Sequence, residues 1–197
     1  MTSQLKSESI GIDRMVERQL RNWELARQKQ SVTPRQPGQQ VAEFIAISRA
    51  VGLPGNEICS LLNLRLGWPV FDREILQAMS GENAWRQELY ESMDERDLSW
   101  MEEFVRAMSV GYGARDDYFN QLTETILTLA RKSHAIFLGR AADLVLPRGI
   151  GLRVRHHFNI EASEQARHDL IINMEVFNSH QAADIIMTAL RSRGIIA

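Results

Sequence analysis

Apolar residues recur at helical spacing near the start of the chain. Ile12, Val16, Leu20 and Trp23 are separated by Arg, Glu and Gln, which predicts an amphipathic helix over about residues 11 to 29. Its apolar face needs a partner surface, either on this chain or on another copy. Residues 31 to 40 contain prolines and glycine without apolar periodicity, which is typical of a mobile linker.

Short apolar runs later in the chain predict the strands of a buried parallel sheet. They lie at residues 44–48, 69–71, 135–138, 152–155 and 169–173. Helical patterns separate them, one over 57–66 and a last one with Ser179 as N-cap and Gly194 just beyond its end. Residues 74 to 132 hold two helical stripes and no convincing strand. This order predicts an α/β fold with a parallel sheet and flanking helices.

The chain is therefore expected to have two parts. Residues 1–40 form an N-terminal helical extension with its linker. Residues 41–197 form one α/β domain, with a helical insertion at about residues 74–132.

Composition and charge narrow the classes of partner. Apolar residues make up 44% and charged residues 24% of the 197 residues, which suits a globular chain. The 23 basic and 25 acidic side chains nearly balance, so we expect no nucleic-acid or membrane partner. Cys59 is the only cysteine, which excludes an internal disulfide. Without an apolar run long enough for a membrane span or a secretory signal, we expect a cytoplasmic protein.

The turn after the first strand contains Gly52 and Gly55 and leads into a helix. Glycine lets a backbone approach phosphate oxygens, and a helix N-terminus offers free N–H groups to an anion. The turn lacks the lysine and the Ser/Thr of the G-x-x-x-x-G-K-[ST] loop. On pattern alone, an ordinary strand-to-helix turn is at least as good an explanation.

Three ordered motifs favour a phosphate site. The run from Phe44 to Leu76, FIAISRAVGLPGNEICSLLNLRLGWPVFDREIL, resembles the opening of cytidylate-kinase-like proteins, close to I-S-R-x-x-G-S-G-G-R-E-I and then L-G-x-P-x-x-D-R/K-E-I. Residues 135–143, AIFLGRAAD, resemble that family's strand ending in G-R-x-A-D, and residues 168–173, HDLIIN, resemble its last strand, Y-D-L-V-I-N. The resemblance covers about residues 41–193.

The resemblance implies a P-loop-type three-layer fold and a reaction. Members of the family transfer the γ-phosphoryl group of ATP to a nucleoside monophosphate, with Mg²⁺. The resemblance implies CMP as the acceptor for this chain. The implied cofactors are ATP and Mg²⁺, the implied partners are nucleotides, and no metal ligand is assigned to the protein. By resemblance, the cofactor-binding positions are Ser48, Arg49, Gly52, Gly55, Asn56 and Glu57. The substrate-binding positions are Asp72, Arg73, Arg140 and Asp143, and Arg49 and Arg140 are the catalytic positions.

Each of these side chains also has a structural explanation. Arg140 follows a buried strand, where α/β folds bind ligands, which favours phosphate binding over an ion pair. Asp143 is equally well explained by an ion pair with Arg140 or Arg148. Asp72 is equally well explained as a helix N-cap beside a solvated Arg73. Cys59 is expected to pack on the inner face of its helix.

Two departures from the family pattern predict weak activity. The loop reads Gly52-Leu53-Pro54-Gly55-Asn56, so Pro54 removes one N–H group and Asn56 removes a positive charge that Arg49 could replace. Between Arg155 and Asp169 there is room for little more than a crossover, where the family carries a crossover helix and an arginine-bearing lid. We therefore expect weak ATP binding and slow CMP phosphorylation. The alternative is a non-catalytic nucleotide-binding or protein-interaction module, and the N-terminal helix could mediate a homo-oligomer.

Overall fold

The computed structural model describes most of the chain. The described residues are 2–30, 41–49, 52–81, 85, 87, 89, 91, 93, 98, 99, 101–103, 105, 106, 117–139, 142–146, 151–157 and 168–197. The linker and domain boundary predicted at residues 31–40 lie outside them.

A five-stranded parallel sheet forms the centre of the fold. The strands are β1 (Phe44–Arg49), β2 (Val70–Phe71), β3 (Ala135–Leu138), β4 (Leu152–His157) and β5 (Leu170–Asn173). Their order is β2-β3-β1-β4-β5, and every adjacent pair is parallel. All five predicted strands are confirmed, with bounds that differ by at most two residues. β1 is central: its Ile47 pairs with Leu138 of β3 and with Val154 of β4.

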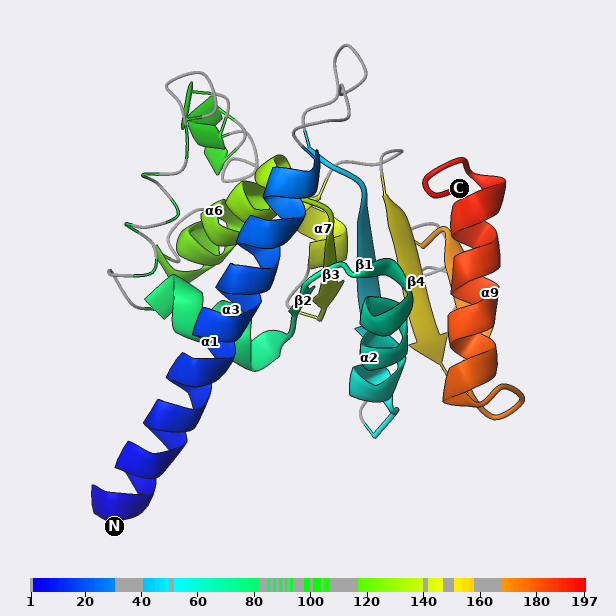
Figure 1. Ribbon diagram of the computed structural model, residues 1–197, viewed down its shortest axis with the longest axis horizontal. Helices are drawn as coiled ribbons and strands as arrows, with labels where there is room; N and C mark the ends of the chain where they lie inside the picture. The colour runs from blue at the N-terminus through cyan, green and yellow to red at the C-terminus, as the bar shows by residue number, and fades with distance from the viewer. Residues whose placement is uncertain are drawn as a thin grey trace.

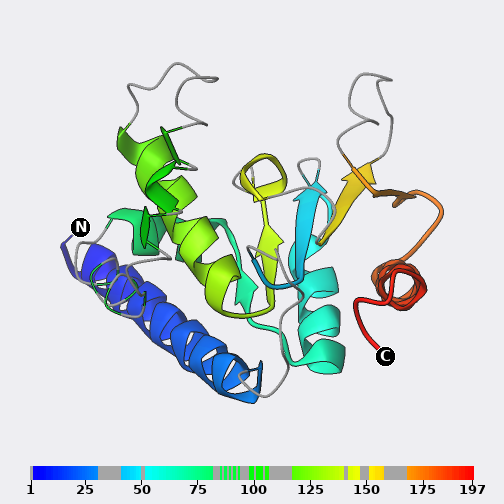
Figure 2. The same cartoon turned by 90° about the horizontal axis from the view of Figure 1, so that it is seen from above.

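Helices cover both faces of this sheet. They are α1 (Thr2–Gln30), α2 (Gly55–Leu66), α3 (Arg73–Gly81), α6 (Asp117–Lys132), α7 (Ala142–Val145) and α9 (Ser179–Ser192). Figures 1 and 2 show α1, α3 and α6 on one face, and α2 and α9 on the other. The result is the predicted three-layer α/β architecture. Within the described part of the chain, every helix is too short or too polar to traverse a lipid bilayer.

Alternation along β1 divides the core into two halves. Phe44 and Ala46 pack with the apolar sides of α1, α3 and α6, whereas Ile45 and Ile47 pack with α2 and α9. Successive side chains of a strand point to opposite faces. A continuous apolar run is therefore what a strand buried on both faces requires.

The ends of α2 and α9 follow local capping rules, with one correction. α2 ends at Gly67, which adopts φ 67° and whose N–H donates to the carbonyl of Asn63, as αL caps do. The N-cap of α9 is Asn178 rather than the predicted Ser179. Asn178 and Gln181 form a reciprocal capping box, with hydrogen bonds of 3.0 Å in each direction. The side-chain oxygen of Asn178 accepts the N–H of Gln181, so the cap lies one residue before the predicted position.

The predicted N-terminal helix is confirmed, and α1 begins about nine residues earlier than expected. Its buried residues Val16, Leu20 and Trp23 belong to the core shared with α3 and α6. The indole Nε1 of Trp23 donates to the carbonyl oxygen of Leu129 at 3.0 Å. The apolar stripe is therefore covered within this chain. A homo-oligomer through α1 stays a prediction.

A hydrogen bond also ties α1 to the edge of the sheet. The N–H of Val70 in β2 donates to Gln19 Oε1 at 3.3 Å. β2 is the outermost strand next to β3, and an edge strand exposes N–H groups that invite pairing with other chains. α1 therefore covers this edge of the sheet.

Candidate functional site

A cavity of about 800 Å³ opens where the parallel strands end. Four segments supply polar side chains to it: the end of β1, the start of α2, the start of α3, and the residues after β3. The predicted site residues that line it are Ser48, Arg49, Asn56, Asp72, Arg73 and Asp143. Because the carboxyl ends of parallel strands meet at one edge of a sheet, residues far apart in sequence converge there.

The side chain of Arg49 lies across the turn that leads into α2. Its guanidinium donates to the carbonyl oxygen of Leu53 at 3.3 Å. A Cβ atom at Gly55 would lie 2.7 Å from Nε of Arg49, so only glycine leaves room for this arrangement. Arg49 thus brings a positive charge to the turn whose sequence lacks one at Asn56.

Two residues at the end of the turn offer no free backbone donor. Pro54 has no N–H group, and the N–H of Gly55 donates to the carbonyl of Leu53 at 2.8 Å. Pro54 is also the N-cap of α2 and provides no side-chain cap. Within the described chain, the N–H groups of Asn56 and Glu57 therefore remain as anion donors in the first turn of α2.

Three of the predicted cofactor-binding residues do not line the cavity. Gly52 adopts φ 89° and shapes the turn, and Gly55 lies beneath Arg49. The carboxylate of Glu57 accepts a hydrogen bond of 2.6 Å from the hydroxyl of Ser179. That bond ties the start of α2 to the start of α9, so the Glu57 side chain holds the two helices together.

Asp72 caps α3 and also lines the cavity. Its Oδ1 accepts the N–H groups of Glu74 at 3.1 Å and of Ile75 at 3.0 Å. The capping explanation is thus confirmed, and it leaves Oδ2 available to a ligand. Arg73 is exposed at the cavity wall, and no described residue forms a hydrogen bond or ion pair with it. These two residues place one negative and one positive charge side by side.

Asp143 is paired with a residue to which the motifs assign no role. His168 Nε2 lies 3.5 Å from Asp143 Oδ2, and the His168 side chain is 2% exposed. The contact brings the residues just before β5 next to α7, beside the cavity that Asp143 lines. Arg140 and Arg148, the ion-pair partners expected from the sequence, lie outside the described residues. The catalytic and substrate-binding roles predicted for Arg140 therefore stay predictions. The one sign of this contact in the sequence is that His168 stands where the third motif has tyrosine.

Cys59 lies beneath the site and is chemically inert. It is buried on the inner face of α2, as predicted. Burial, together with the smaller effect of the Asp72 charge and against the opposing effect of the Arg49 guanidinium, raises the pKa of its thiol to about 12. At neutral pH the group is therefore a thiol rather than the nucleophilic thiolate.

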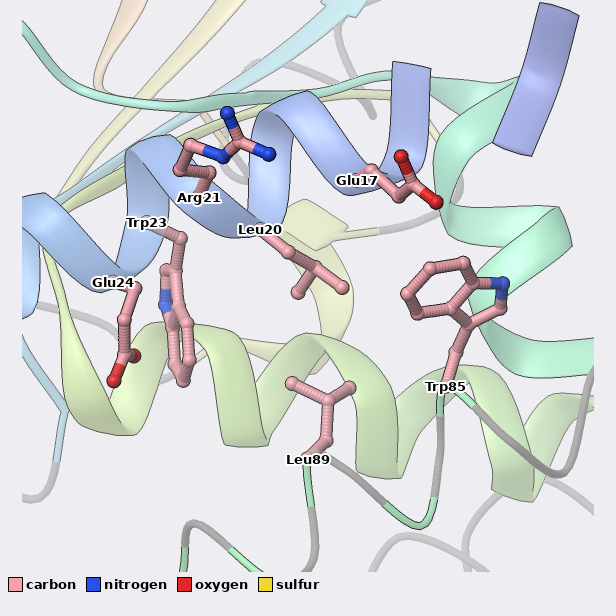
Figure 3. Close-up of a pocket in the computed structure, with 7 residues that line it drawn as sticks. All are labelled: Glu17, Leu20, Arg21, Trp23, Glu24, Trp85 and Leu89. Atoms are coloured by element: carbon pink, nitrogen blue, oxygen red, sulfur yellow. The ribbon is translucent and has the colours of Figure 1, made fainter. Parts of the chain in front are cut away.

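A second hollow lies beside α1 and differs in chemistry. Figure 3 shows it between Trp23 and Leu20 of α1 and the facing Trp85 and Leu89. Its volume is about 490 Å³, and Glu17, Arg21 and Glu24 stand along it. Two carboxylates and one guanidinium do not favour a phosphate. The cavity at the strand ends, which Arg49 and Arg73 line, is therefore the better candidate site for an anion.

The described residues contain no group of three His, Cys, Asp or Glu side chains that could hold a metal ion. Mg²⁺ in phosphoryl-transfer sites needs no such cage, because it keeps several waters and is held by substrate phosphates with one or two carboxylates. Asp72 and Asp143 line the same cavity. The donor set therefore fits a magnesium ion that arrives with the nucleotide.

Comparisons with known proteins place the chain in a family. The model of the cytidylate kinase-like family matches residues 44–193. A crystal structure of a protein from Eubacterium ventriosum has the same fold, with a TM-score of 0.55 at 15% identity, over 78% of this chain and 99% of that one. Among proteins with curated descriptions, none matches this sequence. Since the family match spans well over half of the 197 residues, the chain belongs to the cytidylate kinase-like family.

Proposed function

We propose that this protein binds a nucleotide at the strand-end cavity and transfers a phosphoryl group slowly from ATP to a nucleoside monophosphate, with CMP as the first candidate. The observation that carries the proposal is the convergence of Arg49, Asn56, Asp72 and Arg73 on one cavity. Phosphoryl transfer depends mainly on positioning and on neutralising charge. Two arginines beside a helix N-terminus provide both.

The two arginines have separate tasks in this proposal. Arg49 lies over the turn before α2, where it neutralises the phosphates of the donor nucleotide. Arg73 lies at the start of α3, beside Asp72, where it binds the monophosphate acceptor. A guanidinium binds phosphate bidentately and stays charged at any physiological pH. Asp72 and Asp143 would hold Mg²⁺, which shields the phosphate charge when it is bound.

Slow turnover follows from what the turn and the last crossover lack. The N–H of Gly55 is already used, and Pro54 has none, so the turn offers fewer donors to developing charge. Only residues 158–169 connect β4 to β5. A parallel crossover alone requires about ten to twelve residues, which leaves no length for an arginine-bearing lid.

A second candidate is nucleotide binding without catalysis. The observation that favours it is the position of Arg49, which donates to Leu53 and covers Gly55. A guanidinium that stays over the turn binds a phosphate in the ground state and in the transition state equally. Uniform binding of that kind gives affinity without rate.

Calorimetric titration with ATP and with CMP, beside a coupled assay of ADP release, tests the proposal. Arg73→Gln removes a charge-assisted bond worth about 1.5–3 kcal/mol, so we expect CMP affinity to fall about tenfold to a hundredfold. Arg191→Gln, an exposed arginine at the far end of α9, is the matched control and should bind CMP like the wild type.

The outcomes separate the two candidates. Binding of both nucleotides with measurable CMP-dependent ADP release supports the slow kinase. Binding without release supports the non-catalytic alternative. Wild-type protein that binds neither nucleotide at millimolar concentration contradicts both.

A further inference from the structure

Helix α1 forms part of the wall of the nucleotide cavity. Met15 of α1 lines the cavity of about 800 Å³ together with Arg49 and Arg73. A neighbouring cavity of about 460 Å³ lies between α1 and α2, and the two cavities share Met15, Asn56, Asp72 and Leu138. They therefore meet at the first turn of α2. In Figure 2, α1 and α2 lie on either side of β2.

Contacts on the rest of α1 hold this wall in place. Val16 and Trp23 are buried in the core, and the indole of Trp23 is bonded to the carbonyl of Leu129. Gln19 accepts the N–H of Val70 at the edge of the sheet. These anchors lie on both sides of Arg18 in the sequence. The backbone of Arg18 is therefore fixed, while its side chain is exposed.

Arg18 faces the turn that has lost its positive charge. It lines the α1–α2 cavity together with Asn56 and Ser60 of α2 and with Asp72. No described residue forms a hydrogen bond or ion pair with the Arg18 guanidinium, and Oδ1 of Asp72 is occupied by the N–H groups of α3. The exposed guanidinium is thus available to a ligand in this cavity, which the carboxylate of Asp72 also lines.

We propose that Arg18 binds the phosphates of the donor nucleotide and replaces the cation that the turn lacks at Asn56. The inference rests on the proposed nucleotide function. α1 lies outside residues 44–193, which match the family, so this cation is added to the site by a separate segment of the chain. The ligand is a polyphosphate, because Arg18, Arg49 and Arg73 all line the joined cavities and three guanidinium groups favour a multiply charged anion.

Titration of four proteins with ATP and with inorganic pyrophosphate tests this inference. The proteins are the full-length wild type, Arg18→Gln, Arg18→Lys and Arg21→Gln. Arg21 is the matched control because it is an exposed arginine of the same helix that lines the other hollow and neither of the two joined cavities. Arg18→Gln should weaken both ligands about tenfold or more, Arg18→Lys should recover most of the affinity, and Arg21→Gln should stay within about twofold of wild type.

Thermal unfolding of the ligand-free variants separates binding from structure. All three variants should have the melting temperature of the wild type, because neither Arg18 nor Arg21 is buried. Arg18→Gln that binds ATP like the wild type overturns the role of Arg18 and leaves the proposed function intact. Pyrophosphate binding that depends on Arg18, without binding of ATP, overturns the proposed function and the donor nucleotide as the ligand, and supports Arg18 only as a residue that binds another polyphosphate. Wild-type protein that binds none of these ligands overturns both.

Discussion

Trp23 is the residue on which the docking of α1 depends most. It is 4% exposed, its Nε1 donates to Leu129, and the guanidinium of Arg27 lies 5.9 Å from its ring centroid. Trp-to-Ala substitutions in a core cost about 3–5 kcal/mol. Trp23 also borders the hollow of about 490 Å³ beside α1, so part of the space left by its ring opens to solvent. We therefore expect Trp23→Ala to lower the free energy of unfolding by about 3 kcal/mol, near the lower end of that range.

A second substitution removes less of the side chain. Trp23→Phe keeps an aromatic ring but loses the indole N–H and part of the ring system, so the expected cost is about 2 kcal/mol, between wild type and Trp23→Ala. The assay is equilibrium unfolding in urea, followed by far-UV circular dichroism. Leu25→Ala is the control on the same helix, because Leu25 is 51% exposed; its effect should stay within about 0.5 kcal/mol. A Trp23→Ala protein as stable as Leu25→Ala would show that α1 is not docked on this core.

Three further predictions concern the sheet, Cys59 and α9. Gly151→Ala should destabilise the fold by about 1–3 kcal/mol in urea unfolding, because its Cβ would lie 2.5 Å from the buried ring of Phe44; unchanged stability would contradict the packing of β4. Burial raises the pKa of Cys59 from its ordinary value of 9.0 to about 12, so the stability that the protonated thiol contributes is complete below pH 9 and is lost as pH rises towards 12. Between these pH values the free energy of unfolding of the wild type should fall more steeply than that of Cys59→Ala, by up to about 1.4 kcal/mol per pH unit, and profiles of equal slope would be the contrary result. Asn178→Ala removes one half of the capping box with Gln181, which should cost about 1 kcal/mol in thermal unfolding, against no change if the cap is unimportant.

Much of the fold could be predicted from the sequence because its strands are buried on both faces. A run such as Phe44 to Ile47 fits only the centre of a sheet covered by helices. Gly67 and Gly194 follow the helices that they end. The early start of α1 was missed because residues 2–10 carry no apolar stripe. Adding a residue to an existing helix costs far less than nucleating one, so α1 extends outward from its docked part.

The site was only partly predictable, for a different reason. Motif positions such as Asp72 and Asp143 converge because they follow parallel strands. Side-chain directions depend on tertiary contacts. The position of Arg49 over Gly55 and the contact of His168 with Asp143 therefore left no periodic signal. The placement of Met15 and Arg18 beside α2 depends on how α1 returns to the domain, which its spacing does not encode.

Mapping amide chemical shifts during titration with ATP and then with CMP tests the central claim most directly, because it locates the ligand without requiring turnover. The account predicts that the largest changes fall on Ser48, Arg49, Asn56, Asp72 and Arg73, the residues of the strand-end cavity. Changes confined to the groove beside Trp85, or no changes at millimolar nucleotide, would contradict it.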